Sequence, residues 1–259
     1  YSHRLDHNMD DPPNSKSYEQ SSSFVQLQTA TEQYFSDGNV KPLQRAVTGF
    51  IFNQMSAKAG IKKHGRRAVE VLYNEFLQLN NKDVFEALNA SSLSKEEKQG
   101  ALRAINLVKE KRDGSLKGRT VADGRKQRDL YDKADTTSPT VSVDALLLTL
   151  IVDAYEGRDV AICDIAGAYL NALMDEFVVM KLEGDMVDIF CEMDPSFRKF
   201  VVMEGGKQVL YLRLHKALYG CVKAALLWYD LYSTTLVHMG YKINAYDPCV
   251  ANKIIEGTQ

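Results

Sequence analysis

Residues 160–171 read Val-Ala-Ile-Cys-Asp-Ile-Ala-Gly-Ala-Tyr-Leu-Asn, an apolar run that ends in the carboxylate of Asp164. The run predicts a short buried strand over Val160–Asp164, followed by a turn. A carboxylate at the end of a buried strand is unfavourable unless it is paired or binds a cation, so Asp164 is a candidate metal ligand. The alternative is that Asp164 caps a helix or forms an ion pair.

The segments around this run mix helices with strands and do not alternate regularly, which indicates the α+β class. Ser94 and Glu97 form a capping-box pattern, which predicts a helix that continues through Val108. Gly114 and Gly118 predict turns. The remaining predicted helices are 68–79, 142–154 and 222–239, and the remaining predicted strands are 177–182, 200–204, 208–214 and 248–255.

The composition is that of a folded protein. Of the 259 residues, 45% are hydrophobic and 25% are charged, which excludes a wholly disordered chain. The apolar run Ala145–Val152 is too short for a membrane span, which needs about 20 residues. The net charge is −2, but Arg103–Arg128 carries +6 and the remaining chain −8. A local basic region is typical of phosphate binding, or of a solvated helix end and loop.

The spacing of the cysteines argues against a zinc site, and the absence of known catalytic motifs excludes several classes of enzyme. No pair of the four cysteines has the CxxC spacing of a zinc site, so we expect free, mostly buried thiols in an intracellular protein of the cytoplasm or nucleus. The sequence contains no GxSxG, HExxH, Walker A or GxGxxG motif.

Two glycine-containing segments are candidates for phosphate binding. Lys117 and Arg119 lie in a predicted hairpin, where their cationic side chains can clamp a triphosphate or a nucleic-acid backbone. Gly220 precedes the predicted helix 222–239, and glycine lets the backbone approach a ligand at a helix N-terminus. The alternative for the second segment is an ordinary capped amphipathic helix.

Five ordered segments resemble the reverse transcriptase of Ty1/copia-type retrotransposons. Lys117–Gly124 is similar to the family's K-A-R-[LT]-V-A-x-G fingers segment, and Ser138–Val141 to its S-P-[VT]-V turn. Asp164–Asn171 resembles the first palm motif, D-[IV]-x-x-A-[FY]-L-N. Val209–Gly220 resembles V-x-x-L-x-K-A-L-Y-G, and Asp247–Val250 matches D-P-C-[LV].

The resemblance implies a right-hand polymerase with fingers and palm, which synthesises DNA by two-metal nucleotidyl transfer with Mg²⁺ or Mn²⁺. It implies as partners an RNA or DNA template–primer, deoxynucleoside triphosphates, and the integrase and ribonuclease H of the same polyprotein. Asp164 would be the catalytic carboxylate and would hold metal together with the backbone carbonyl of Ile165. Tyr169 would stack under the deoxyribose and exclude a 2′-hydroxyl. The residues that the resemblance places at the nucleotide are Lys117, Arg119, Ile165, Tyr169, Tyr219 and Gly220.

The sequence departs from the family pattern at Ala166, where the family often carries Lys, and at two further places. After Gly220 the pattern L-K-Q-A-P-R-A-W is replaced by Cys-Val-Lys-Ala-Ala-Leu-Leu-Trp, which moves the lysine to Lys223 and lacks the glutamine and arginine. The family's second palm motif, Y-V-D-D, is absent, so we expect a fragment truncated before it and inactive on its own. The alternatives are a non-catalytic nucleic-acid-binding remnant of a decayed or domesticated element, and an α+β protein with no nucleic-acid role.

The predicted organisation has three parts. Residues 1–60 are expected to be a partly disordered connector with weak helical periodicity near its end, and residues 61–110 a helical connector. Residues 111–259 are expected to be a partial reverse transcriptase domain of fingers and palm. A palm sheet without its central hairpin would leave strands 160–164 and 248–255 unpaired, so we expect an aggregation-prone, loosely packed fragment.

Overall fold

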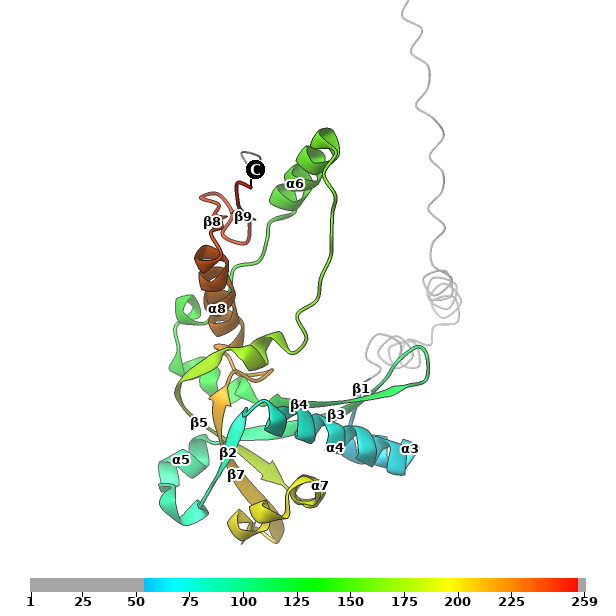
Figure 1. Ribbon diagram of the computed structural model, residues 1–259. Coiled ribbons are helices and arrows are strands. Elements are labelled where there is room, and N and C mark those ends of the chain that lie inside the picture. The colour runs from blue at the N-terminus through cyan, green and yellow to red at the C-terminus, as the bar shows by residue number, and fades with distance from the viewer. Residues whose placement is uncertain (1–53, 256–259) are drawn as a thin grey trace, which may run out of the picture. The chain divides into compact units, whose positions relative to one another are not determined.

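A curled sheet of seven strands organises residues 54–255, the part of the chain that the computed structural model describes (Figure 1). The strand order is β1-β3-β5-β7-β2, with β4 paired to β3 and β6 paired to β7. All these pairings are antiparallel except that of β3 with β5. The strands are β1 (Gln54–Ser56), β2 (Phe85–Leu88), β3 (Leu102–Glu110), β4 (Leu116–Ala122), β5 (Leu173–Glu183), β6 (Val202–Glu204) and β7 (Lys207–Lys216).

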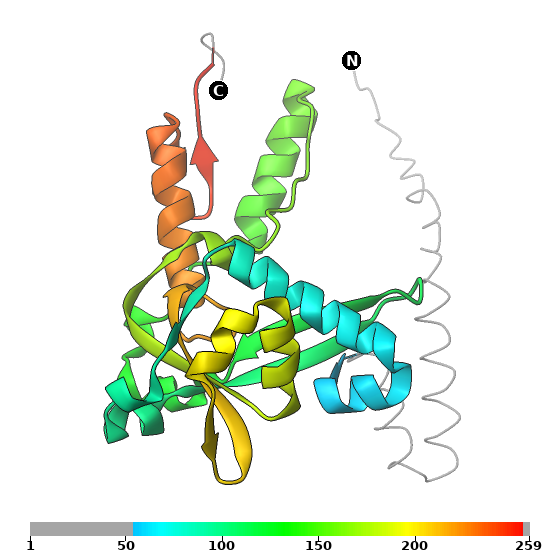
Figure 2. The same cartoon turned by 60° about the horizontal axis from the view of Figure 1, so that its bottom comes forward.

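Helices α4 and α7 bury their apolar faces in the core and lie side by side (Figure 2). Phe76 of α4 packs edge-on against Phe190 of α7, with 5.2 Å between ring centroids. Leu72 is fully buried because it lies on the same stripe of α4 as Phe76. The helices are α3 (Ala57–His64), α4 (Arg66–Asn81), α5 (Lys95–Gly100), α6 (Val143–Glu156), α7 (Asp185–Met193) and α8 (Ala224–His238).

The structure confirms the predicted mixture of helices and strands and most of the individual elements. The helix predicted over 68–79 is α4, and those over 142–154 and 222–239 are α6 and α8. Ser142 caps α6 by accepting a hydrogen bond from the Ala145 amide at 3.1 Å, and Gly157 ends it in a left-handed conformation. The three predicted strands between residues 177 and 214 correspond to β5, β6 and β7. The helical periodicity predicted near residues 26–55 lies outside the described residues, except for two residues of β1.

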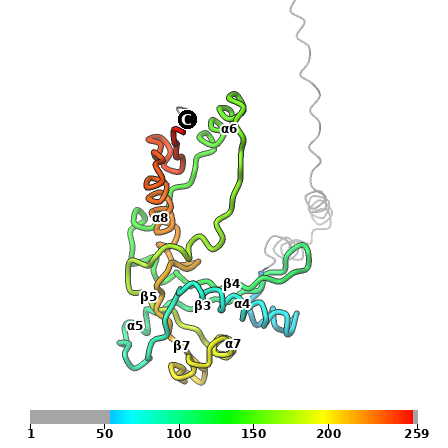
Figure 3. Tube along the Cα trace, in the orientation of Figure 1, coloured from blue at the N-terminus to red at the C-terminus, as the bar shows by residue number. Residues whose placement is uncertain are grey.

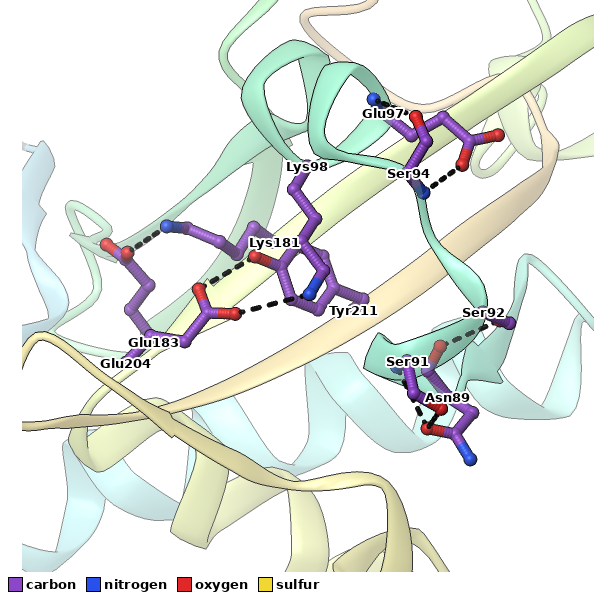
Figure 4. A network of polar contacts seen from close by, with 10 residues as sticks. All are labelled: Asn89, Ser91, Ser92, Ser94, Glu97, Lys98, Lys181, Glu183, Glu204 and Tyr211. Atoms are coloured by element: carbon purple, nitrogen blue, oxygen red, sulfur yellow. Dashed lines mark hydrogen bonds and ion pairs between the residues drawn. The ribbon is translucent and has the colours of Figure 1, made fainter.

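The helix predicted from Ser94 through Val108 is wrong beyond its first turns. The capping box itself forms: the Ser94 amide donates to Glu97 at 2.7 Å and the Glu97 amide donates to the Ser94 hydroxyl at 3.1 Å (Figure 4). The helix ends at Gly100, and residues 102–110 form β3. Leu102, Asn106 and Val108 are buried at even spacing, which is the periodicity of a strand. The capping box marks only where a helix begins and carries no information about these later residues.

The strand predicted over Val160–Asp164 is also wrong. The segment has no strand partner within residues 54–255 and its apolar side chains are exposed, Ile162 to 98%. The last predicted strand is shortened to β9 (Ala251–Asn252), which pairs with β8 (Lys242–Ile243) and so is not partnerless. Gly118, expected in a turn, lies inside β4.

Helices α6 and α8 project from the sheet. Nearly all apolar side chains of α6 are exposed, whereas most of those of α8 are partly buried. Figure 3 shows the trace running out to α6 and returning to the turn at Ala168–Asn171 (η4). No residue of α6 is buried, and Ala224 is the one buried residue of α8. Asp247, in the segment after α8, contacts the start of α6: one of its carboxylate oxygens accepts a hydrogen bond from the Ser142 amide at 2.8 Å. No helix in residues 54–255 is long and apolar enough to cross a membrane.

The expectation of mostly buried thiols is correct for two of the four cysteines. Cys191 and Cys221 are buried, whereas Cys163 and Cys249 are exposed. The exposed pair lies in the two segments whose predicted strands are missing or shortened, so the burial expected from those strands is lost with them.

Candidate functional site

Strand β4 presents two cationic side chains on one face. Successive side chains of a strand point to opposite faces, so Lys117 and Arg119 share the face opposite to Gly118 and Thr120. Gly118 and Thr120 are buried, whereas Lys117 is exposed and Arg119 is partly exposed. Lys117 and Arg119 take part in none of the ion pairs found within residues 54–255. Their charges therefore remain available to an anion.

Two tyrosines from distant segments meet beside Arg119. The Arg119 guanidinium carbon lies 4.6 Å from the ring centroid of Tyr219, a cation–π distance. The Tyr219 ring lies 4.7 Å from that of Tyr169, which belongs to η4. Three of the side chains predicted to bind nucleotide therefore form one contiguous surface, and Lys117 lies two residues away on the same strand.

Gly220 makes a close backbone contact, but its partner is protein. Its φ of 94° lies in the left-handed region, and a Cβ there would come well within 3.0 Å of the Ala122 carbonyl oxygen. A Cβ on Gly124 would come equally close to the Gly220 carbonyl oxygen. The Ala122 amide donates to the Tyr219 carbonyl at 2.8 Å. Glycine at 220 and 124 thus lets the segment carrying Tyr219 lie directly against the end of β4.

Helix α4 completes the surface from the other side. Glu75 accepts a hydrogen bond from the Thr120 amide through its Oε1 atom at 2.9 Å. Burial raises the pKa of Glu75, while the hydrogen bond and the charges of Lys117 and Arg119 act in the opposite direction. A cavity of about 70 Å³ lies among α4, β4, η4 and the segment after β7. Its lining includes Glu75, Gln78, Lys117, Arg119, Gly167 and Tyr219.

Glu75 lies within the helix predicted over 68–79, and no role at the site was predicted for it. The signal that could have singled it out is a charged residue within an apolar stripe, with Val71 on one side and Leu72, Phe76 and Leu79 on the other. A carboxylate in such a stripe needs a partner, and the partner lies 45 residues away along the chain.

Asp164 and Ile165 do not join this surface through any contact found in the described residues. Both are exposed, in a segment without helix or strand. Residues 54–255 contain no group of three or more histidine, cysteine, aspartate or glutamate side chains that could hold a metal ion. The carboxylates of these residues therefore do not fit a complete two-metal centre, which needs several carboxylates around the ions.

Lys223 is engaged elsewhere. It stands at the N-terminal end of α8, forms an ion pair with Asp175 and lies 5.7 Å above the ring of Tyr131. Tyr131 in turn donates a hydrogen bond to Glu176. Lys223, the lysine of the segment that differs from the family pattern, thus belongs to a separate polar cluster near the start of α8.

Part of the basic segment 103–128 is neutralised within the protein. Arg125 pairs with Asp123 at 2.6 Å, and this hydrogen bond lowers the pKa of Asp123 to about 2. Arg103 lies 4.0 Å from Glu183. Arg119 of this segment lies over Tyr219, and Lys117 lines the same cavity as Arg119 and Tyr219.

One comparison with known proteins identifies the family of this chain. The family model described as reverse transcriptase (RNA-dependent DNA polymerase) matches residues 85–252, which include Lys117, Arg119, Asp164, Tyr169 and Tyr219. No curated protein and no solved structure matched the chain. The match extends over more than half of the sequence. The chain belongs to the reverse transcriptase (RNA-dependent DNA polymerase) family.

Proposed function

We propose that the chain provides the fingers and part of the palm of a Ty1/copia-type reverse transcriptase and binds deoxynucleoside triphosphate and template–primer. The observation that carries the proposal is the convergence of Arg119, Tyr219 and Tyr169 beside Lys117. Arg119 and Lys117 supply charge for phosphate oxygens, and the tyrosine rings supply flat apolar surface for a sugar or base.

The packing of Arg119 on Tyr219 supports this role. A guanidinium that rests on an aromatic face is restricted in its rotamers, so less conformational entropy is lost when it binds a phosphate. Tyr219 is itself fixed to β4 by the hydrogen bond from the Ala122 amide. The cation and its aromatic support are therefore held by one backbone contact, and a phosphate would meet a preorganised site.

Metal-dependent synthesis needs more than the described residues supply. Asp164 is the candidate metal ligand, and within residues 54–255 it belongs to no cluster of three potential ligands. We therefore expect this chain by itself to bind nucleotide and template–primer without extending the primer. The same observation favours the second candidate function, a nucleic-acid-binding product without catalysis, over an enzyme complete in these residues.

Binding of a fluorescently labelled template–primer and of a labelled deoxynucleoside triphosphate tests the proposal by anisotropy. Arg119→Ala and Lys117→Ala should each weaken binding by about 10- to 100-fold, because a charge-assisted contact contributes about 1.5–3 kcal/mol. Each should also reduce the salt dependence of template–primer binding by about one ion. Arg198→Ala, which removes a cation paired to Asp188 at 3.1 Å, is the matched control and should change binding less than about twofold.

Equal binding by wild-type protein and Arg119→Ala would contradict the assignment of this surface. A primer-extension assay with Mg²⁺ or Mn²⁺ separates the two candidate functions further. Extension that is lost in Asp164→Ala would show that a metal centre assembles around Asp164, whereas binding without extension favours the non-catalytic function.

A further inference from the structure

The outer edge of β4 is held at two points. Within residues 54–255 this strand pairs only with β3, so the N–H groups on its other edge need partners from elsewhere. The Thr120 amide donates to Glu75 at 2.9 Å and the Ala122 amide donates to Tyr219 at 2.8 Å. Because these donors are two residues apart, they point to the same side of the strand.

These two hydrogen bonds enclose the cationic side of the site. The Thr120 N–H belongs to the peptide group that follows Arg119, so the Glu75 carboxylate fixes the plane of that peptide. The hydrogen bond from the Ala122 amide to the Tyr219 carbonyl fixes the backbone of Tyr219. The Arg119 guanidinium rests on the ring of this residue. A shift of either hydrogen bond would move Arg119 relative to Tyr219.

Helix α4 lies in direct contact with β4 at Gly118. A Cβ on Gly118 would come well within 3.0 Å of the Val71 carbonyl oxygen, and 3.2 Å from the Cβ of Glu75. The absence of a side chain at 118 therefore brings the helix backbone directly onto the strand. Glu75 is half-buried at this contact and lies between the strand and the cavity that Lys117 and Arg119 also line.

We propose that Glu75 is a positioning residue for nucleotide binding, which it supports through its hydrogen bond to the Thr120 amide. Helix α4 then belongs to the nucleotide site, although it lies outside the matched residues 85–252. The inference rests on the proposed function, because it assumes that Lys117 and Arg119 receive the phosphates. It adds a residue and a helix that neither the motifs nor the family match include.

The charge of Glu75 and its hydrogen bond make different predictions, which separates positioning from electrostatics. Glu75→Gln keeps an oxygen acceptor and removes the charge. Glu75→Asp keeps the charge and withdraws the carboxylate by one methylene from the Thr120 amide. Glu75→Ala removes both, and Glu70→Ala removes an exposed carboxylate from the same helix as the control.

The assay measures the affinity for a fluorescently labelled deoxynucleoside triphosphate, together with hydrogen exchange of the Thr120 amide. We expect Glu75→Ala and Glu75→Asp to bind about tenfold more weakly, with faster exchange at Thr120. Glu75→Gln should stay within about threefold of wild type and Glu70→Ala within about twofold, both with slow exchange. If Glu75→Ala does not fold, the comparison of Glu75→Asp with Glu75→Gln decides.

Three outcomes would overturn the inference. Faster exchange at Thr120 with unchanged nucleotide affinity would make Glu75 a structural residue only. Binding by Glu75→Gln as weak as that of Glu75→Asp would assign the effect to something other than the hydrogen bond. Failure of the wild-type protein to bind nucleotide would reject the proposed function, and this inference with it. The first two results, in contrast, leave the proposed function intact.

Discussion

Substitution of Gly220 by alanine tests the close contact between the segment carrying Tyr219 and the end of β4. The new Cβ would come well within 3.0 Å of the Ala122 carbonyl oxygen, and also of a side-chain carbon of Val121. The main obstacle is backbone and cannot rotate away, so the segment must shift. A shift would break the 2.8 Å hydrogen bond from the Ala122 amide to the Tyr219 carbonyl.

The expected loss of stability has two parts. A residue with a side chain at a φ of 94° is strained by about 1–2 kcal/mol. Loss of the Ala122 hydrogen bond, which leaves a polar group unpaired, costs about 1–3 kcal/mol. Gly220→Ala should therefore lower the free energy of unfolding by about 2–5 kcal/mol, and it should weaken nucleotide binding because Arg119 loses its fixed support.

Two further glycines separate these parts. Gly205 has a φ of 57° and open space around its missing Cβ, so Gly205→Ala reports backbone strain alone. A Cβ on Gly124 would overlap the Gly220 carbonyl oxygen, while Gly124 itself has no positive φ, so Gly124→Ala reports overlap alone. Urea denaturation followed by circular dichroism measures all three. A loss in Gly220→Ala no larger than in Gly205→Ala would refute the close contact.

Three other predictions concern exposure and charge. Leu148 on α6 is 63% exposed, so Leu148→Ser should change the free energy of unfolding by less than about 0.5 kcal/mol. Leu72 on α4 is fully buried, so Leu72→Ala should lower the free energy of unfolding by about 2–5 kcal/mol. Urea denaturation measures both. The pKa of Asp123 is lowered from 3.8 to about 2, so wild-type protein should be more stable than Asp123→Asn above pH 3.8. This difference in stability should be lost as the pH falls through 2. A difference that is unchanged at pH 2 would contradict the assignment. Of the four thiols, Cys163 and Cys249 should react rapidly with a thiol reagent in the folded protein, and the two buried ones only after denaturation.

Local patterns predicted those elements whose partners lie close by or whose ends are capped. The helices predicted over 68–79 and 142–154 correspond to α4 and α6, and α6 is capped at Ser142 and ends at Gly157. The capping box at Ser94 marked where a helix begins but not how long it is, and the buried alternation of β3 decided the rest.

The strand expected at Val160–Asp164 failed for a different reason. A run of four apolar residues shows a tendency to pair, but a strand exists only where a neighbouring strand supplies hydrogen bonds. Within residues 54–255 none does so for this segment. Pairing is a property of the whole sheet, and short runs carry little information about it.

The site divides in the same way. The motifs predicted Lys117, Arg119, Tyr169 and Tyr219, and the structure brings all four to one surface. The place of Glu75 beside these residues was not predicted, because its partner is a backbone N–H at the free edge of β4 and a backbone donor leaves no signal in a sequence motif.

Strand β2 cannot pair with β7 until the ribosome has synthesised the residues between them. Phe85 pairs with Leu214, which follows it by 129 residues. A ribosome that adds about 5–20 residues per second needs roughly 6 to 26 s to supply that partner. During this interval β2 lacks the strand with which it pairs, and long-range pairings of this kind also fold slowly. We therefore expect chaperones that bind exposed apolar segments to engage nascent chains between these two points.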